Sequence, residues 1–252
     1  MDLHLSGTRV LVTGGTRGIG RAVVEAFLAE GADVAFCARS RDEVSETQAT
    51  LSERGTVRGA TVDVGDAEAL AAWVEESAES LGGLDVVVAN VSALAIPDTE
   101  ENWQASLNVD LMHTVRLVRA AMPHLEASEA ASIIAISSVS GRESDFASGP
   151  YGTAKTAIVG YIHGLAMQLA SQGIRANTVS PGNTYFEGGV WQNIETGNPD
   201  LFTTAMDLNP TGHMGTPEEV AAPVVFLASN VARRISGTNL VVDGALTRGV
   251  QL

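Results

Sequence analysis

Short apolar runs alternate with longer amphipathic segments along almost the whole chain. Apolar runs without internal polar positions are typical of strands that are buried on both faces of a parallel sheet. The segments between them place apolar residues at helical spacing, as Ala22, Val23 and Phe27 do. The pattern therefore predicts seven strands, at 9–13, 34–37, 85–89, 132–136, 174–179 and 240–242 and in a segment that ends at 61–62.

Helices are expected between these strands. Ser40 and Glu43 match a capping box, in which a hydroxyl and a carboxylate satisfy the first free N–H groups of a helix. Long helices are predicted over 99–125 and 151–172. Strands that alternate with helices form right-handed βαβ units. The fold prediction is one doubly wound α/β domain over residues 1–252, with a mostly parallel sheet and helices on both faces.

Two segments depart from this alternation. Residues 181–215 are rich in Gly, Asn, Thr and Pro and lack periodicity, which predicts a long loop that acts as a lid over the substrate. The second segment is the helix after Tyr151, which has no charged residue between Lys155 and Arg175. A helix that is apolar on nearly all sides needs cover beyond the sheet. We therefore expect a homo-oligomer, either a tetramer or a dimer.

Acidic residues outnumber basic ones, 30 against 15, and the formal net charge is −15. This charge would repel nucleic acid and an anionic membrane surface alike. We therefore expect neither a nucleic-acid partner nor membrane association. A phosphate-bearing ligand would need a local group of basic side chains, so the positions of the arginines become important.

Cys37 is the only cysteine, so no disulfide can form within the chain. The segment Met1–Leu5 lacks the basic and apolar regions of a secretory signal. No apolar stretch reaches the roughly 20 residues that a membrane-spanning helix needs. These features indicate a cytoplasmic protein. No metal site is expected, because the histidines are scattered and no cluster of cysteines or carboxylates has ligand spacing.

A glycine-rich turn joins the first predicted strand to the first predicted helix. Glycines let the backbone turn sharply and approach a pyrophosphate, and the helix start offers free N–H groups and the positive end of its dipole. Within a βαβ series, such a turn predicts a dinucleotide-binding site. The candidate residues are Gly14, Thr16, Arg17, Gly18, Ile19 and Gly20.

The end of the second strand distinguishes between cofactors. An acidic residue there would bind the ribose hydroxyls of NAD(H), whereas a basic residue attracts the 2′-phosphate of NADP(H). This chain has Arg39 at that place and no acid, and Arg17 lies in the glycine-rich turn. Two guanidinium groups in an acidic chain favour NADPH over NADH. The alternative is NAD(H) binding with both arginines solvated.

Tyr151 and Lys155 lie four residues apart at the start of a predicted helix, so they share a face. A free phenol with a pKa of about 10 is a poor acid or base near neutrality, and a nearby ammonium stabilises the phenolate. Ser138 follows the fifth strand, where open α/β sheets bind ligands, and can donate to a developing oxyanion. Asn108 is an amide in an apolar part of the long helix and needs a partner. These four residues are the catalytic candidates.

With these motifs in this order, the chain resembles the short-chain dehydrogenase/reductase family over nearly its whole length. The resemblance rests on residues 13–20, Asp63-Val64, Asn108, Ser138, Tyr151, Lys155, Pro181-Gly182 and Val242-Asp243-Gly244. It implies that Tyr151 is the general acid/base, that Ser138 orients the carbonyl and that Lys155 holds the nicotinamide ribose. It also implies that Asn108 supports a water-linked proton relay. Asp63 and Val64 are expected to meet the adenine.

This sequence departs from the family pattern in three places. Where the family often has Asn-Asn-Ala-Gly, this chain has Ala89-Asn90-Val91-Ser92, and only Asn90 matches. Phe186 stands where the family often has a threonine, and Thr184 comes two residues earlier. The frequent Val-Asp-Gly-Gly ending has Ala245 as its last residue. We still expect cofactor contacts from Asn90, Pro181, Gly182 and Thr184.

The expected function is hydride transfer between NADP(H) and a carbonyl or secondary alcohol, with Tyr151 as general acid/base. One alternative is an NAD(H)-dependent alcohol dehydrogenase. A second is a dinucleotide-binding regulatory protein without turnover, because a fold alone does not determine activity. Aromatic residues indicate an apolar wall for a small-molecule substrate whose identity the sequence does not set; they are Phe146, Tyr185, Phe186 and Trp191.

Overall fold

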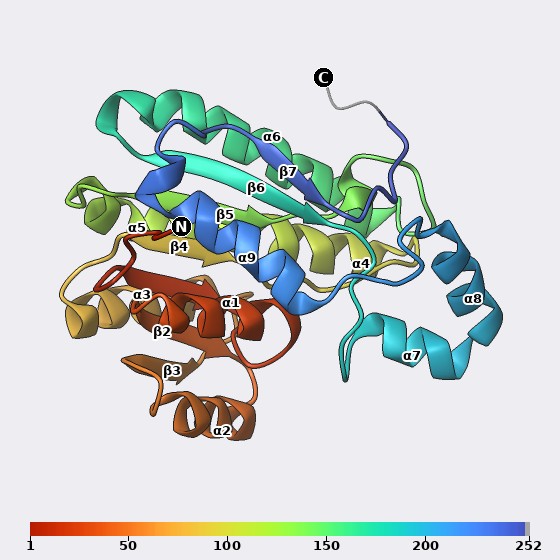
Figure 1. Cartoon of the computed structure of the whole chain (residues 1–252), viewed down its shortest axis with the longest axis horizontal. Helices are drawn as coiled ribbons and strands as arrows, with labels where there is room; N and C mark the ends of the chain where they lie inside the picture. The colour runs from red at the N-terminus through yellow and green to blue at the C-terminus, as the bar shows by residue number, and fades with distance from the viewer. Residues whose placement is uncertain (250–252) are drawn as a thin grey trace.

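The strands form a single parallel sheet in this computed structural model, which describes residues 1–249. Within that range seven strands follow the order β3-β2-β1-β4-β5-β6-β7 (Figure 1). The prediction of a mostly parallel sheet is therefore confirmed, and all the strand pairs described are parallel. The bounds are β1 (Arg9–Thr13), β2 (Asp33–Ala38), β3 (Val57–Thr61), β4 (Val86–Ala89), β5 (Ser132–Ile136), β6 (Arg175–Pro181) and β7 (Asn239–Val242).

The order of the strands reverses in the middle of the sheet. The chain runs outward from β1 through β2 to β3, then returns to pair β4 with the other side of β1. The loops that leave β1 and β4 consequently run in opposite directions and leave a crevice at the carboxyl ends of these strands. In open α/β sheets, ligands bind at such a switch point.

Helices cover both faces of the sheet, as expected. α1 and α9 contact each other over one face, and α3, α5 and α6 cover the opposite face (Figure 1). The longer helices are α1 (Gly18–Ala29), α2 (Arg41–Leu51), α3 (Ala67–Leu81), α4 (Glu100–Ala105), α5 (His113–Glu126), α6 (Pro150–Leu169), α7 (Val190–Gly197), α8 (Pro199–Leu208) and α9 (Pro217–Ala228). Single helical turns occur at η2 (Val139–Gly141), η3 (Ala170–Gln172) and η4 (Asn230–Ala232), and η1 (Ser106–Met112) is a π-helical segment.

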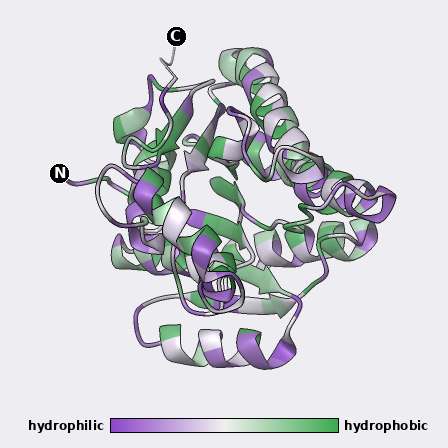
Figure 2. Cartoon of the chain, turned by 90° about the vertical axis from the view of Figure 1, so that its right-hand side faces the viewer, coloured by the Kyte–Doolittle hydropathy of each residue, from purple (hydrophilic) through white to green (hydrophobic). Residues whose placement is uncertain are grey.

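Successive side chains along each strand point to opposite faces of the sheet, so the sheet has one hydrophobic core on each face. On β1, Val10 and Val12 belong to the core that includes residues of α1 and α9, whereas Leu11 between them belongs to the core that includes residues of α3, α5 and α6. All three side chains are fully buried, and each stabilises the fold by about 1.5–3 kcal/mol. Figure 2 shows hydrophobic residues on the central strands and hydrophilic ones toward the outer turns of the helices. Burial on both faces explains why the strands read as apolar runs.

The long helix predicted over 99–125 forms without a break over 100–126, but it is not α-helical throughout. The structure divides it into α4, the π-helical segment η1 and α5. A π-helix has about one more residue per turn than an α-helix and so rotates the side chains that follow it. The π-helical segment therefore changes which side chains along the helix share a face.

The segment 181–215 also differs from the long loop that was predicted. It contains α7 and α8, which lie beyond the carboxyl end of the sheet (Figure 1). Trp191 and Met214 are buried against Ala205 in a small separate core. Each helix is short, so periodicity gave little signal. No helix within residues 1–249 has the length and hydrophobicity to cross a bilayer.

Candidate active site

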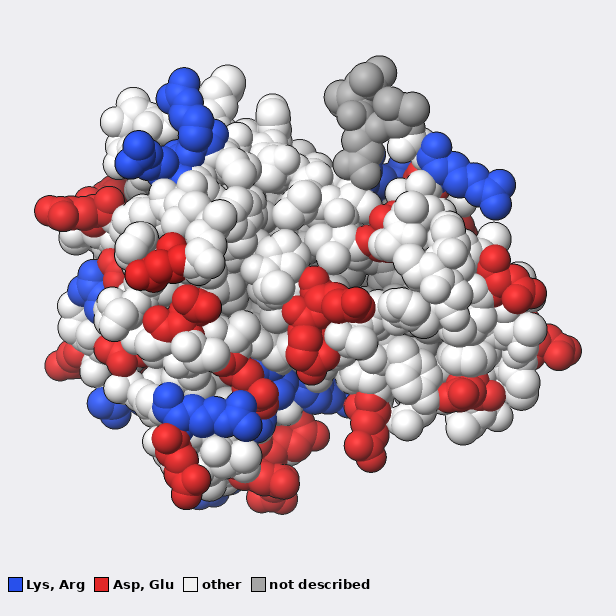
Figure 3. All heavy atoms as spheres, viewed as in Figure 1, with Lys and Arg blue, Asp and Glu red and all other residues white. Residues whose placement is uncertain are grey.

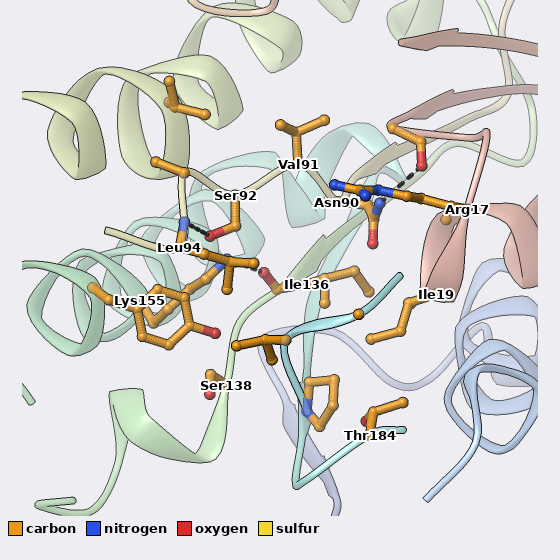
Figure 4. Close-up of a pocket in the computed structure, with 18 of the residues that line it drawn as sticks. Arg17, Ile19, Asn90, Val91, Ser92, Leu94, Ile136, Ser138, Lys155 and Thr184 are labelled. Atoms are coloured by element: carbon orange, nitrogen blue, oxygen red, sulfur yellow. Dashed lines mark hydrogen bonds between the residues drawn. The ribbon is translucent and has the colours of Figure 1, made fainter. Parts of the chain in front are cut away.

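A pocket of about 670 Å³ opens at the switch point. Its walls come from the glycine-rich turn after β1, the ends of β2 to β6, the start of α6 and the beginning of segment 181–215. Figure 4 shows Lys155 and Ser138 at one end of this pocket and Arg17 and Ile19 at the other. The pocket thus has a catalytic end near Lys155 and a nucleotide end near Arg17.

Glycines are sterically required in the turn between β1 and α1. Gly14 and Gly18 adopt φ angles of +72° and +53°, which disfavour other residues. A Cβ atom on Gly20 would lie 2.0 Å from the carbonyl oxygen of Gly14. Asn90 braces the turn, since its Nδ2 donates to the carbonyl oxygens of Thr13 at 3.1 Å and Gly14 at 3.3 Å. The turn therefore presents bare backbone to the pocket.

The start of α1 is suited to an anion. Arg17 occupies the N-cap position and makes no side-chain capping hydrogen bond. Within the described residues, no acidic side chain lies in the first turn of α1. The first N–H groups of the helix are thus available to a pyrophosphate, and the helix dipole favours it. The turn, with Ile19, fits the dinucleotide expected there.

The nucleotide end carries exposed charges of both signs. Arg17 and Arg39 are exposed and line the pocket, and Arg17 Nη1 lies 3.5 Å from the carbonyl oxygen of Gly188. Asp63 and Val64 line it too. Figure 3 shows acidic side chains spread over the visible face and basic ones in smaller groups. The surface as a whole is acidic, and the nucleotide end of the pocket differs from it because two arginines lie there.

Glu43 is a pocket residue whose role the sequence reading missed. Ser40 Oγ accepts from Glu43 N, as a cap should, but the Glu43 carboxylate accepts from Thr16 Oγ1 at 2.9 Å. Only half of the predicted capping box therefore forms. The carboxylate joins α2 to the glycine-rich turn and adds a negative charge beside Arg17 and Arg39. The capping pattern located Glu43 on the helix but could not show where its side chain turns.

The segment after β4 leaves little room beside the glycine-rich turn. A Cβ on Gly14 would lie 2.9 Å from Val91 Cγ2, so Val91 closes directly over the turn. Ser92 Oγ accepts from Leu94 N at 3.0 Å. Leu94 has a φ of +49°, a left-handed conformation that costs a leucine about 1–3 kcal/mol. Strain of this kind is common at binding sites, and Leu94 lines the pocket.

Tyr151, Lys155 and Ser138 come together at the catalytic end. Lys155 Nζ lies 5.6 Å from the centroid of the Tyr151 ring and donates to the carbonyl oxygen of Ile136 at 3.1 Å. Ser138 follows β5 and is 8% exposed, with its Oγ accepting from Ser140 N. Both hydroxyl-bearing side chains line the same pocket. A phenol, an ammonium and a hydroxyl therefore converge where β5 ends.

Asn108 is not part of this group. Its Nδ2 donates to the carbonyl oxygen of Gly65, and its Oδ1 accepts from Arg116 at 2.7 Å. It is absent from the described lining of the pocket. The polar residue of η1 that faces Lys155 is Asp110, whose Oδ1 lies 3.2 Å from Lys155 Nζ. The sequence pointed to Asn108 because of its apolar surroundings, but the structure places Asp110, on the π-helical segment η1, beside Lys155.

His113 is a second buried polar residue that the sequence reading passed over. Its Nε2 lies 3.0 Å from Thr13 Oγ1, and its Nδ1 lies 3.1 Å from the carbonyl oxygen of Val109. Burial lowers the pKa of His113 to about 3, and the cations of Lys155 and Arg116 act in the same direction. The ring is therefore neutral, donates from Nδ1 and accepts from Thr13. It ties the start of α5 to the end of β1.

Segment 181–215 covers the pocket with aromatic side chains. The rings of Trp191 and Phe146 meet edge to face, with centroids 5.9 Å apart. Phe186 lies so close to Gly18 that a Cβ there would be 2.5 Å from its ring. Thr184 Oγ1 donates to the carbonyl oxygen of Gly182, and both residues line the pocket together with Pro181. The segment thus contacts the glycine-rich turn and forms one wall of the pocket at its catalytic end.

Known proteins resemble this chain over nearly its full length. A family model described as enoyl-(acyl carrier protein) reductase matches residues 14–247. The isoepoxydon dehydrogenase patN of Penicillium expansum is 43% identical over 253 residues, which cover 98% of this chain and 97% of that protein.

Solved structures agree. L-sorbose reductase from Gluconobacter frateurii, complexed with NADPH and L-sorbose, has a TM-score of 0.92 and 28% identity, covering 99% of this chain and 100% of that one. A short chain dehydrogenase from Burkholderia cenocepacia in complex with NADP has a TM-score of 0.86 and 30% identity, covering 96% and 98%.

Proposed function

Because this chain belongs to the short-chain dehydrogenase/reductase family of oxidoreductases, we propose that it transfers a hydride between NADP(H) and a carbonyl or secondary alcohol carbon. The observation that carries this proposal is the convergence of Tyr151, Lys155 and Ser138 beside a glycine-rich turn at the switch point. A phenol held near an ammonium is suited to proton transfer near neutral pH.

The residues at the catalytic end divide the chemistry among them. In reduction, Tyr151 donates a proton to the carbonyl oxygen, and Ser138 donates a hydrogen bond to the same oxygen. Lys155 stabilises the phenolate that remains, and in oxidation the phenolate takes the proton back. The bound nicotinamide supplies or accepts the hydride. Lys155 also has an N–H donor free for the nicotinamide ribose, because an ammonium has three.

We propose NADP(H) as the preferred cofactor. Arg17 and Arg39 line the nucleotide end, and guanidinium groups bind phosphate well. Both neighbouring structures described above are complexes with NADP or NADPH, which supports the same preference. Asp63 and Val64 would meet the adenine, and Thr184, Pro181 and Gly182 would lie along the nicotinamide half. Asn90 would act indirectly, because it donates hydrogen bonds to the glycine-rich turn.

The substrate is proposed to be a small carbonyl compound or alcohol held beneath segment 181–215. The relatives' names include a dehydrogenase of isoepoxydon and a reductase of L-sorbose, so hydroxylated ketones belong among the candidates. Phe146 and Trp191 would provide an apolar wall, and α7 and α8 would act as the lid.

We further propose that the enzyme is a cytoplasmic homo-oligomer. On α6, Met167 is 78% exposed, and Val159 and Leu165 are only partly buried. A second subunit that covers this helix would remove them from water. Sedimentation measurements on the purified protein would show a dimer or tetramer, and a monomer at micromolar concentration would contradict this part of the proposal.

A cofactor-consumption screen tests the main proposal. Ketoses, cyclic hydroxyketones, simple ketones, 3-oxoacyl esters and the matching alcohols are offered with NADPH or NADH, and absorbance of the reduced cofactor is followed. We expect turnover with at least one carbonyl compound and lower KM for NADPH than for NADH. Tighter NADH binding would favour an NAD(H)-dependent alcohol dehydrogenase. Cofactor binding without turnover of any substrate would favour a regulatory protein.

A further inference from the structure

Asp110 is a buried carboxylate at the catalytic end. Its side chain is 0% exposed, and Oδ2 accepts a hydrogen bond from Ala93 N at 3.1 Å. Oδ1 makes no hydrogen bond among residues 1–249, yet it lies 3.2 Å from Lys155 Nζ, so the contact is an ion pair without hydrogen-bond alignment. A buried carboxylate is very costly unless a cation lies beside it. Lys155 is that cation.

The arrangement fixes where the Lys155 ammonium sits. Nζ is held between the carbonyl oxygen of Ile136 at 3.1 Å and the carboxylate of Asp110 at 3.2 Å. The lysine side chain is 2% exposed, so water provides little alternative. The Tyr151 ring centroid lies 5.6 Å from the same Nζ. An Asp110 carboxylate at this place offsets part of the positive charge that Tyr151 experiences.

We propose that Asp110 is the counter-ion of Lys155 and a positioning residue that sets the pH range of proton transfer by Tyr151. The inference deepens the proposed hydride transfer and rests on it. Asp110 does not touch the reacting atoms; it acts through Lys155. Asn108, two residues earlier, is excluded from this role by its contacts with Gly65 and Arg116.

The other charged or titratable groups around this corner are few within the described chain. α5 contributes two groups. Arg116 is a cation that donates to Asn108 Oδ1 at 2.7 Å, and His113 is neutral because burial lowers its pKa to about 3. The turn that follows β5 contributes Asp145, which is exposed and accepts from Ser140 Oγ at 2.6 Å. The segment after β4 contributes only backbone, through Ala93 N. Asp110 is therefore the buried negative charge of this corner.

An Asp110→Asn variant tests the proposal, because asparagine has the same shape without the charge. Loss of the anion favours the Tyr151 phenolate. For alcohol oxidation, which requires that phenolate, the midpoint of the rise of kcat with pH should move to lower pH by about one unit. An Asp110→Glu variant keeps the charge and should return the midpoint toward the wild-type value, whatever its kcat.

Asn108→Ala is the matched control, because it lies on the same π-helical segment but faces away from Lys155. Its midpoint should equal that of the wild type. An Asp110→Asn midpoint that is unchanged or moves to higher pH would overturn the proposal. So would an infrared band of a buried protonated carboxyl in wild-type protein near pH 7, which requires no variant to fold. If Tyr151→Phe is fully active, the proposed function itself fails, and the two failures are distinguishable.

Discussion

The two ends of the pocket hold their charges in different ways. At the nucleotide end, the charged residues Arg17, Arg39 and Glu43 line the pocket and are all exposed. At the catalytic end, Lys155 and Asp110 are removed from solvent and lie 3.2 Å apart. Exposed charges are screened by water and salt, whereas a buried charge depends on its partner. A single substitution at the nucleotide end should therefore leave the fold stable, whereas removing one member of the buried pair leaves an uncompensated charge.

The largest effect on stability is expected from breaking the buried pair. Lys155→Met leaves Asp110 buried without a cation and should lower the free energy of unfolding by about 3–5 kcal/mol. Denaturant unfolding measures this loss. Adding Asp110→Asn to the same protein removes the isolated charge, so the double variant should regain most of the stability. If the two losses simply add, the pair is not coupled and the comparison between the two ends fails.

A second effect concerns His113, which is neutral when folded because burial lowers its pKa to about 3. An unfolded histidine takes up a proton near pH 6.5. The unfolded state therefore binds more protons between these pH values, and the free energy of unfolding falls as pH drops from about 6.5 toward 3. His113→Gln should remove up to about 1.4 kcal/mol per pH unit from this slope.

Denaturant unfolding at several pH values from 7 to 4.5 would reveal the change in slope. His163→Gln is the matched control, because His163 is exposed and bonded only to the carbonyl oxygen of Gly237 among the contacts described. Equal slopes for wild type and His113→Gln would contradict a neutral His113.

A smaller effect is expected at the nucleotide end. Arg39→Asp replaces an attraction for the 2′-phosphate with a repulsion and should raise the Kd of NADPH by about ten- to a hundredfold. NADH binding should change little, because NADH has no such phosphate. Arg41→Asp is the control, since Arg41 is exposed on α2 but is not among the described pocket residues. Equal losses of affinity for NADPH and NADH would show that Arg39 does not bind the 2′-phosphate.

The sequence predicted the regular part of the molecule well. Strands such as β2 and β5 are buried on both faces, and this burial produces the apolar runs from which they were predicted. The glycine-rich turn was also visible, because Gly14, Gly18 and Gly20 satisfy steric needs that no other residue meets. Each of these features depends on a few consecutive residues, so it is visible in a short stretch of sequence.

The less predictable features depend on a change of helical phase or on contacts distant in sequence. Asn108 was selected because it is an amide in an apolar part of a predicted helix, whereas Asp110 of the π-helical η1 is the residue that lies beside Lys155. His113 contacts Val109 on η1 and Thr13 on β1. Thr13 is a hundred residues away from His113 in the sequence. α7 and α8 are stabilised by a small core of their own. Each helix is too short for its periodicity to predict that core.

The central claim is that the Tyr151 phenol, activated by Lys155, transfers the proton that accompanies hydride transfer. Its most direct test is a single-turnover measurement of NADPH oxidation by Tyr151→Phe, with the best carbonyl substrate and saturating cofactor. We expect the rate to fall by about a hundredfold or more, with the NADPH Kd unchanged within about twofold. A Tyr151→Phe enzyme that oxidises NADPH at the wild-type rate would contradict the claim.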